Sequence, residues 1–307
     1  MRRSLLAVCT ALALGLAVAA APAASASAPA EATEIQQLHA RGSASPRGGA
    51  STPITYHGGA VMADAGGVHA YVVWYGGWDN GATTVVSKGS TLLADELAHI
   101  GGSPYFNINT TYTNGSGGYV HNAVTLAGQT TDYGYSLGKR LTDANIRTIV
   151  SNAISSGRLP KDTNGVYFVL TAKDVSETSG FLTKYCGWHT HATIGGSDIK
   201  YAFVGDPSTK LANCSAQSVG PNGSAYAGAD AMASVVAHEL EEAASDPDLN
   251  AWYDGSGAEN ADKCAWTFGA TSIAANGAKY NVTWGTTQYL VQQNWVAGAT
   301  QGCAMSY

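Results

Sequence analysis

One short segment of this chain concentrates residue types that could do chemistry. The sequence VVAHELEEAASDP, residues 235–247, places His238, Glu239, Glu241 and Glu242 within five positions, in a chain of which only 12% of the residues are charged. Residues four apart on an α-helix lie on the same face, so the His238 imidazole and the Glu242 carboxylate can converge on one metal ion. Zinc accepts both ligand types, and a catalytic zinc site combines three protein ligands with one position for water.

The residue beside the first ligand supports a catalytic interpretation. In His-Glu-x-x-His peptidases the glutamate takes a proton from the zinc-bound water, and Glu239 has that position here. Glu242 replaces the second histidine of that motif, and its negative charge should make the bound water less acidic. We therefore predict a zinc site with Glu239 as the general base. The alternative is a solvated helix face, in which Glu241 and Glu242 contact water and His238 lies at the edge.

A third ligand must come from another part of the chain. The downstream segment AENADKC, residues 258–264, contains Glu259 and Asp262. It resembles the downstream Glu-plus-Asp element of gluzincin peptidases, in which the Glu binds zinc and the Asp orients the first histidine, although the spacing here is one residue shorter. This resemblance implies Glu259 as the third ligand and Asp262 as an orienting residue. The alternative is a pair of loop acids beside a disulfide.

Two other places offer candidate residues. Asp246 follows His238 by eight residues, which corresponds to ~12 Å along a helix, and Pro247 should end the helix there. We therefore expect Asp246 to accept hydrogen bonds near the site rather than to bind the metal. His189 and His191, two apart on an expected strand, face the same side and form a rival His-x-His ligand pair. His189 is also a candidate for contacting substrate or an oxyanion, and ordinary packing is the alternative for both rings.

The N-terminal part of the chain predicts export. Arg2 and Arg3 precede an apolar run and then small residues, which is typical of a secretory signal peptide with cleavage after Ala26. Residues 27–52 are rich in Ala, Ser, Gly and Pro, which predicts a disordered linker or a pro-segment. Residues 53–307 contain no second linker and are expected to form one domain. Since no later stretch has the ~18 consecutive apolar residues of a membrane span, we expect a secreted, or loosely wall-associated, protein.

Charge and cysteine content limit the partners and the kinds of site. The formal charge of -6 becomes -8 when the two arginines of the signal peptide are removed, which argues against a nucleic-acid partner. Four cysteines remain after Cys9 is lost, and an even number in an exported protein predicts two disulfides. The shorter spans favour Cys186 with Cys214 and Cys264 with Cys303. A four-cysteine metal site is the alternative, but it lacks a close Cys-x-x-Cys pair.

Hydrophobic periodicity predicts the elements that position these residues. Strands are expected at 68–75, 119–126, 166–170 and 200–204, and helices at 83–99, from Thr142 or Asp143 to about Ser156, and at 230–244 with Asp230 as its N-cap. The remainder is loop-rich, with short strands near Thr283 and Tyr289. This order predicts an α+β fold with an α/β-like upper part. We expect a zincin-like mixed sheet that backs the active-site helix.

Several segments resemble the phosphate-induced, or EXORDIUM-like, family of secreted proteins. They occur in order through most of the domain: 56–59 (YHGG), 72–76 (VVWYG), 135–139 (YSLGK), 165–171 (GVYFVLT), 174–175 (DV), 186–189 (CGWH) and 201–205 (YAFVG). The resemblance implies an extracellular or cell-wall protein, and plant members are associated with growth control. It implies no enzyme, because plant members have Asn-Pro where Asp246-Pro247 stands here and lack the His-Glu pair.

Two functions follow from these observations. The first is a secreted zinc-dependent endopeptidase, from a bacterial member of the family, that hydrolyses peptide bonds of a peptide or protein substrate with metal-activated water. The alternative is a non-catalytic extracellular or cell-wall-associated EXORDIUM-like protein, in which exposed Trp and Tyr side chains stack on surface glycans. A structural metal or calcium is a third, weaker hypothesis, since the chain offers many carboxylates.

Overall fold

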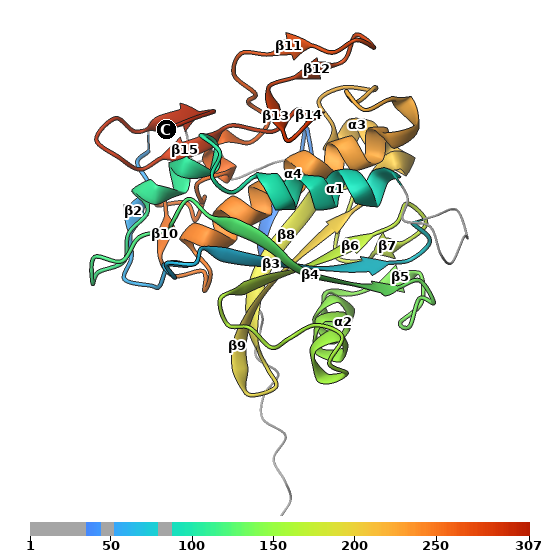
Figure 1. The fold of residues 1–307 in the computed structure, drawn as a ribbon, viewed down its shortest axis with the longest axis horizontal. Helices are drawn as coiled ribbons and strands as arrows, with labels where there is room; N and C mark the ends of the chain where they lie inside the picture. Colours follow the sequence, from blue (N-terminus) through green and yellow to red (C-terminus); the bar gives the residue numbers. More distant parts are fainter. Residues whose placement is uncertain (1–34, 44–51, 79–87) are drawn as a thin grey trace, which may run out of the picture. The chain divides into compact units, whose positions relative to one another are not determined.

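A six-stranded mixed sheet organises the part of the chain that the structure describes (Figure 1). This computed structural model describes residues 35–43, 52–78 and 88–307, all within one compact unit. The predicted signal peptide, residues 1–26, lies outside the described residues. The fold is α+β, as the sequence predicts.

The strand order in this sheet is β1-β8-β9-β6-β3-β4. The four strands from β9 to β4 are parallel, whereas β8 is antiparallel to β9 and β1 is antiparallel to β8. Three of them confirm the strands expected at 68–75, 166–170 and 200–204. The strands are β1 (Gln36–His39), β3 (Val68–Tyr75), β4 (Val124–Asp132), β6 (Gly165–Thr171), β8 (Tyr185–Ile194) and β9 (Ser197–Gly205).

A two-residue turn explains why β8 reverses direction. Gly195 and Gly196 have φ angles of 57° and 79°, and Ile194 pairs with Ser197 across the turn. Positive φ at both central residues is the requirement of the tight hairpin turn whose twist matches that of the strands, and glycine meets it without steric cost. The hairpin places β8 beyond β9, next to the outermost strand β1.

The strand expected at 119–126 is displaced in the structure. β4 begins at Val124 and continues to Asp132, while Tyr119 makes only an isolated bridge with Thr113. The prediction ended too early because β4 lies at the edge of the sheet, where alternate side chains are exposed and polar residues are tolerated.

The helices cover both faces of the sheet, with α1 and α4 on one face and α2 on the other (Figure 1). They are α1 (Lys88–His99), α2 (Asp143–Ser155), α3 (Leu211–Cys214) and α4 (Ala227–Ser245). The start of α2 is confirmed, because Thr142 and Asn145 form a capping box there. The helix expected at 83–99 is confirmed from Lys88 onward, and its first residues lie outside the described ones. In the described residues, no helix has the length and apolarity needed to cross a membrane.

Helix α4 is buried along its whole length. The solvated-face alternative is therefore wrong: Glu241 and Glu242 are both 0% exposed, because the sheet, α1 and the C-terminal segments surround the helix. The predicted N-cap is also wrong. The helix begins at Ala227, one turn earlier than expected, and Asp230 accepts hydrogen bonds from the backbone and side chain of Asn222.

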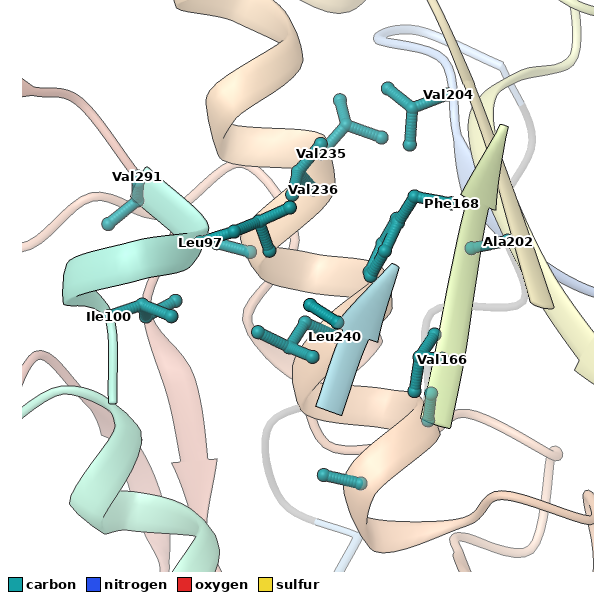
Figure 2. Close-up of a cluster of buried hydrophobic side chains, with 14 of the residues drawn as sticks. Leu97, Ile100, Val166, Phe168, Ala202, Val204, Val235, Val236, Leu240 and Val291 are labelled. Atoms are coloured by element: carbon teal, nitrogen blue, oxygen red, sulfur yellow. The ribbon is translucent and has the colours of Figure 1, made fainter. Parts of the chain in front are cut away.

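Apolar side chains fill the space between α4, α1 and the sheet. Figure 2 shows Val236 and Leu240 of α4 between the strand residues Val166 and Phe168 and the α1 residue Leu97. All five are fully buried. Because this packing holds α4 along its axis, it also sets where the polar residues of the helix lie.

The segment expected to be a disordered linker or pro-segment, residues 27–52, contains an ordered strand. Gln36 pairs with His189 and Leu38 pairs with Gly187, so β1 extends the sheet beyond β8. Leu38 is 0% exposed in the core that contains α4. Disorder was predicted from average composition, which does not detect one apolar residue that fits a neighbouring strand; that prediction is wrong for residues 35–43.

The C-terminal part is loop-rich, as predicted, and one of the two disulfides lies within it, while the other joins β8 to α3. The bonds are Cys186–Cys214 and Cys264–Cys303, the pairing expected from the shorter spans. The short strands expected near Thr283 and Tyr289 are present. The remaining elements are β2 (Thr55–Tyr56), β5 (Arg140–Leu141), β7 (Ser176–Glu177), β10 (Trp252–Tyr253), β11 (Ser272–Ile273), β12 (Lys279–Tyr280), β13 (Val282–Trp284), β14 (Thr287–Tyr289), β15 (Asn294–Val296), β16 (Gly302–Ala304), and the 3-10 turns η1 (Phe106–Thr111), η2 (Ser208–Lys210), η3 (Ser224–Tyr226) and η4 (Asp262–Cys264).

The packing of α4 gives a direct test of the fold. Leu240→Ala should lower the free energy of unfolding by about 2–5 kcal/mol, because it removes a buried side chain and leaves a cavity. Ile273, which is 63% exposed on β11, provides the control, and Ile273→Ala should change it by less than about 0.5 kcal/mol. Urea denaturation measures both; equal effects would contradict the placement of α4.

Candidate metal centre

Helix α4 and the turn η4 bring three ligand-type side chains together. The His238 Nε2 atom lies 3.0 Å from Oε1 of Glu242, one helical turn later, and 3.6 Å from Oδ1 of Asp262. The backbone N–H of Asp262 donates to the same Glu242 oxygen at 2.9 Å. The i, i+4 spacing thus brings His238 and Glu242 together as predicted.

Strand β8 and the loop before η4 add a second group. The His189 Nε2 atom lies 3.1 Å from Oε2 of Glu259 and 3.6 Å from Oε2 of Glu242. Within each group, one ligand atom of every residue lies within 4.8 Å of the others. Glu242 joins the two groups through its two oxygens. We call the five residues the His-carboxylate cluster: His189, His238, Glu242, Glu259 and Asp262.

The spacing of these atoms fits a metal ion. Ligands at 2.0–2.2 Å from a tetrahedral zinc lie about 3.4 Å apart, and the four distances above range from 3.0 to 3.6 Å. The Nε2 atom of His238 approaches two carboxylates without forming a hydrogen bond, and Oε2 of Glu242 also has no hydrogen-bond partner. Buried polar atoms without partners are costly, and an ion between them would satisfy them.

Burial shapes the charge of the cluster. It lowers the pKa of His189 to about 3, with help from His238 and His191, so the His189 imidazole is neutral and able to bind a metal. Burial raises the pKa of Glu242 to about 7 and, with nearby acids, that of Glu259 well above its usual value. For His238, burial opposes protonation, but the Glu242 and Asp262 carboxylates outweigh it and raise the pKa. Burial therefore disfavours the ionised forms of these acids, and a bound divalent cation would favour them, because a carboxylate must be deprotonated to bind a metal.

Glu239 lies beside the cluster under strand β8. It is 0% exposed, and neither carboxylate oxygen has a hydrogen-bond partner. Gly187 makes room for it, since a Cβ at that position would lie 2.9 Å from Oε1 of Glu239 and 2.5 Å from a methyl of Val235. Burial raises the pKa of Glu239 well above its usual value. Its role as a general base stays a prediction.

Comparison with known proteins shows the family of this chain. The family model described as phosphate-induced protein 1 conserved region matches residues 54–305. The chain belongs to this family. Similar proteins of Arabidopsis thaliana include Protein EXORDIUM-like 5, 30% identical over 71% of this chain, and Protein EXORDIUM-like 3, 30% identical over 79%. Protein EXORDIUM is 28% identical over 76% of this chain.

The extent of these matches defines what the family region contains. The chain spans 65% of the length of EXORDIUM-like 5, 80% of EXORDIUM-like 3 and 79% of EXORDIUM. No solved structure matches this chain, so the zincin-like character of the sheet stays a prediction. The whole His-carboxylate cluster lies inside the phosphate-induced protein 1 region, whereas β1 lies before it.

The remaining candidate residues divide between the cluster and other roles. Asp246 accepts hydrogen bonds from the backbone amides of Asn250, Ala251 and Trp252, so it closes the turn after α4. The two histidines of the His-x-His pair have different surroundings. His189 belongs to the cluster, whereas His191 contacts Asp198 and Asp248, whose charges are balanced by Lys200. The structure places Asp262, expected to orient the histidine, as close to His238 as a ligand would be.

The sequence did not identify two residues that lie near the site. Gln36 of β1 donates from Nε2 to Oδ2 of Asp262 at 3.2 Å and to the Gly257 carbonyl at 2.6 Å. Asn294 donates to the buried Glu241 carboxylate. The sequence of β1 gives no period-2 signal, since Ile35 and Leu38 are three residues apart. The partners of Gln36 and Asn294 lie up to 226 residues away in the chain, so local spacing does not reveal them.

A buried ion pair anchors the loop that supplies Glu259 and Asp262. The Lys263 Nζ atom donates to Oδ2 of Asp254 at 2.8 Å, and both side chains are 0% exposed. The other Asp254 oxygen accepts from the Ser256 and Ala258 backbone amides. Asp254 therefore holds both ends of the loop in place.

This anchor yields a stability prediction for the family fold. Asp254→Ala should lower the free energy of unfolding by about 3–5 kcal/mol, because it leaves the Lys263 charge buried without its carboxylate. The matched control is Lys139→Ala, which breaks an exposed pair with Asp174 and should cost less than about 1 kcal/mol. Denaturant unfolding measures both. Similar losses in the two variants would show that Asp254 does not anchor the loop.

Proposed function

We propose that this chain is an extracellular EXORDIUM-like protein that binds a zinc ion in the His-carboxylate cluster. The observation that carries the proposal is the convergence of five ligand-type side chains, four of them buried and Asp262 half-buried, from α4, β8 and the 259–262 loop. Two imidazoles among the ligands favour zinc over calcium, which prefers oxygen ligands only. Both disulfides and the family relatives are consistent with an extracellular location.

The closure of the cluster favours a structural role for the ion in this conformation. His189, His238, Glu242 and Glu259 are at most 2% exposed, and the side chain of Asp262 is 13% exposed. A catalytic zinc needs an open position that substrate can reach. An ion here would instead join β8, α4 and the loop. This favours the non-catalytic alternative over the zinc endopeptidase.

Glycan binding is left out of this proposal. The hypothesis used exposed Trp and Tyr side chains to stack on sugars, but all seven tryptophans lie among the described residues and are buried or half-buried. The exposed aromatic residues there are Tyr119 and Tyr307, at 43% and 60%. Association with cell-wall material remains a proposal that rests on the family alone.

One observation favours a second function, the zinc-dependent endopeptidase. Glu239 follows the ligand His238 directly and has a buried carboxylate without a hydrogen-bond partner. A general base needs a free carboxylate beside the metal-bound water that it deprotonates. The position of Glu239 supports this second function, although the cluster is closed to a peptide in this conformation.

Metal content tests the proposed function. The full chain, reconstituted with zinc, should retain it after gel filtration, and Glu242→Gln should weaken zinc binding more than about 100-fold, because both groups lose their shared ligand. Glu96→Gln is the control. Glu96 is equally buried on α1, and burial raises its pKa well above the usual value, so glutamine replaces a neutral side chain.

Elemental analysis measures the zinc content of each protein, and zinc titration measures its affinity for zinc. In wild type and Glu96→Gln, zinc at a hundred times its Kd should raise the free energy of unfolding by about 2.7 kcal/mol, and Glu242→Gln should show no such rise at that concentration. A metal-free wild type after reconstitution, or unchanged binding in Glu242→Gln, would refute the proposal.

Casein cleavage distinguishes the two functions. If the endopeptidase hypothesis holds, zinc-loaded wild type cleaves casein, while Glu239→Gln keeps its zinc and loses at least about 100-fold in rate, as expected for a missing general base. We expect the zinc-loaded full chain, which has not been cleaved by any protease, to be inactive because the cluster is closed. Cleavage by the uncut chain would contradict the structural role given above.

A further inference from the structure

Strand β1 covers the side of the cluster that faces the sheet edge. It pairs with one neighbour, β8, and its residues Gln36 and Leu38 lie opposite His189 and Gly187. His189 is a member of the cluster, and Gly187 is the residue against which Glu239 packs. Four residues of β1 therefore run antiparallel to the stretch of β8 nearest the cluster and the free carboxylate.

The side chains of β1 occupy the site itself. Gln36 donates to Asp262 at 3.2 Å, and Leu38 is 0% exposed in the core that includes α4. Gln37, between them, points to the opposite side of the strand. A polar residue and an aliphatic residue, two apart, thus face the cluster.

Three contacts beyond β1 hold the strand in place. Trp266 donates from Nε1 to the His39 carbonyl at 3.0 Å, and Arg41 donates to the Ser215 carbonyl at 2.6 Å. The backbone amide of Ala40 donates to Lys184. These anchors come from the family region, residues 54–305, whereas β1 precedes that region. The sheet edge that belongs to the family region itself is therefore β8.

We propose that β1 is an intramolecular plug that occupies a docking edge for an extended peptide on β8, and that its displacement opens the cluster. Displacement would free the backbone groups of β8, which can pair with an added strand. The space of Leu38 would take an aliphatic side chain, and the position of Gln36 a polar side chain near Asp262. The peptide class is polar-x-aliphatic in extended form, antiparallel to β8. The consequence for metal access rests on the proposed zinc site, whereas the docking edge does not.

The test releases β1 from the folded full chain. A site for a specific protease is inserted between Arg47 and Gly48, which lie outside the described residues, and the purified, zinc-loaded protein is cut and freed of its N-terminal fragment. A fluorescent peptide with the sequence of residues 33–41 (TEIQQLHAR) then reports docking by anisotropy. The cut protein should bind it at least about 10-fold more tightly than the uncut protein.

Peptide variants test the register. Replacing the leucine that corresponds to Leu38 by alanine should weaken binding at least about 10-fold, because a buried aliphatic side chain is lost. The same change at Gln37, which faces away from the cluster, should have less than about 3-fold effect. Equal binding by cut and uncut protein, failure of a folded cut protein to bind, or equal effects at the two positions would overturn the proposal.

Chelator access provides the second measurement, on the uncut chain, in case the cut protein loses its fold. The double variant Gln36→Ala with Leu38→Ala should release zinc to a chelator at least about 10-fold faster than wild type, and Gln37→Ala at the wild-type rate. Equal rates in all three would overturn the plug. An uncut chain that holds no zinc after reconstitution, together with a cut protein that still binds the peptide, would leave the docking edge standing and refute the proposed zinc site, so the two failures are distinguishable.

Discussion

The burial of acidic side chains on helix α4 is the constraint on which the rest of the structure depends. Glu239, Glu241, Glu242 and Asp246 all lie on or just after a helix with no exposed face. A buried carboxylate is costly unless hydrogen bonds or opposite charges compensate it. Asn294 donates a hydrogen bond to Glu241, and three backbone amides donate hydrogen bonds to Asp246. Glu242 accepts a hydrogen bond from the Asp262 backbone amide and lies close to the His189 and His238 imidazoles, and the zinc ion that we propose would compensate its charge further.

The sheet makes this burial possible. The hairpin between β8 and β9 places β8 at the side of the sheet that faces α4, so that His189 reaches Glu242 and Glu259. Gly187 gives Glu239 its space. The disulfide at Cys264 and the Asp254 ion pair fix the loop on the other side of the cluster. Each of these features lies in the phosphate-induced protein 1 region, and together they hold the side chains of the cluster close to one another.

Family membership and site chemistry describe different aspects of the molecule. The family match covers residues 54–305, and the relatives are consistent with an extracellular protein. The chemistry comes from the residues of this chain: two histidines, three ligand-type acids and a free carboxylate in a closed site. Closure by β1 reconciles the two, because the same cluster can be structural when covered and accessible to a peptide when the strand leaves.

The sequence by itself determined the local features of this protein. Periodicity identified β3, β6, α2 and most of α4, and the i, i+4 spacing paired His238 with Glu242, because helices and buried strands repeat over short distances. The shorter sequence separations favoured the two disulfides that the structure contains. Ion pairs, ligand groups and edge strands instead depend on which distant segments become neighbours.

Only the tertiary structure decided the rest. It buried all of α4, paired Glu259 with His189, brought Asp262 to His238, and placed β1 over them. None of these contacts has a local signal, since the partners are between 24 and 226 residues apart or, for α4, lie all around the helix. Packing of the sheet against α4 selects them, and that selection depends on the shape of the whole core rather than on any one segment.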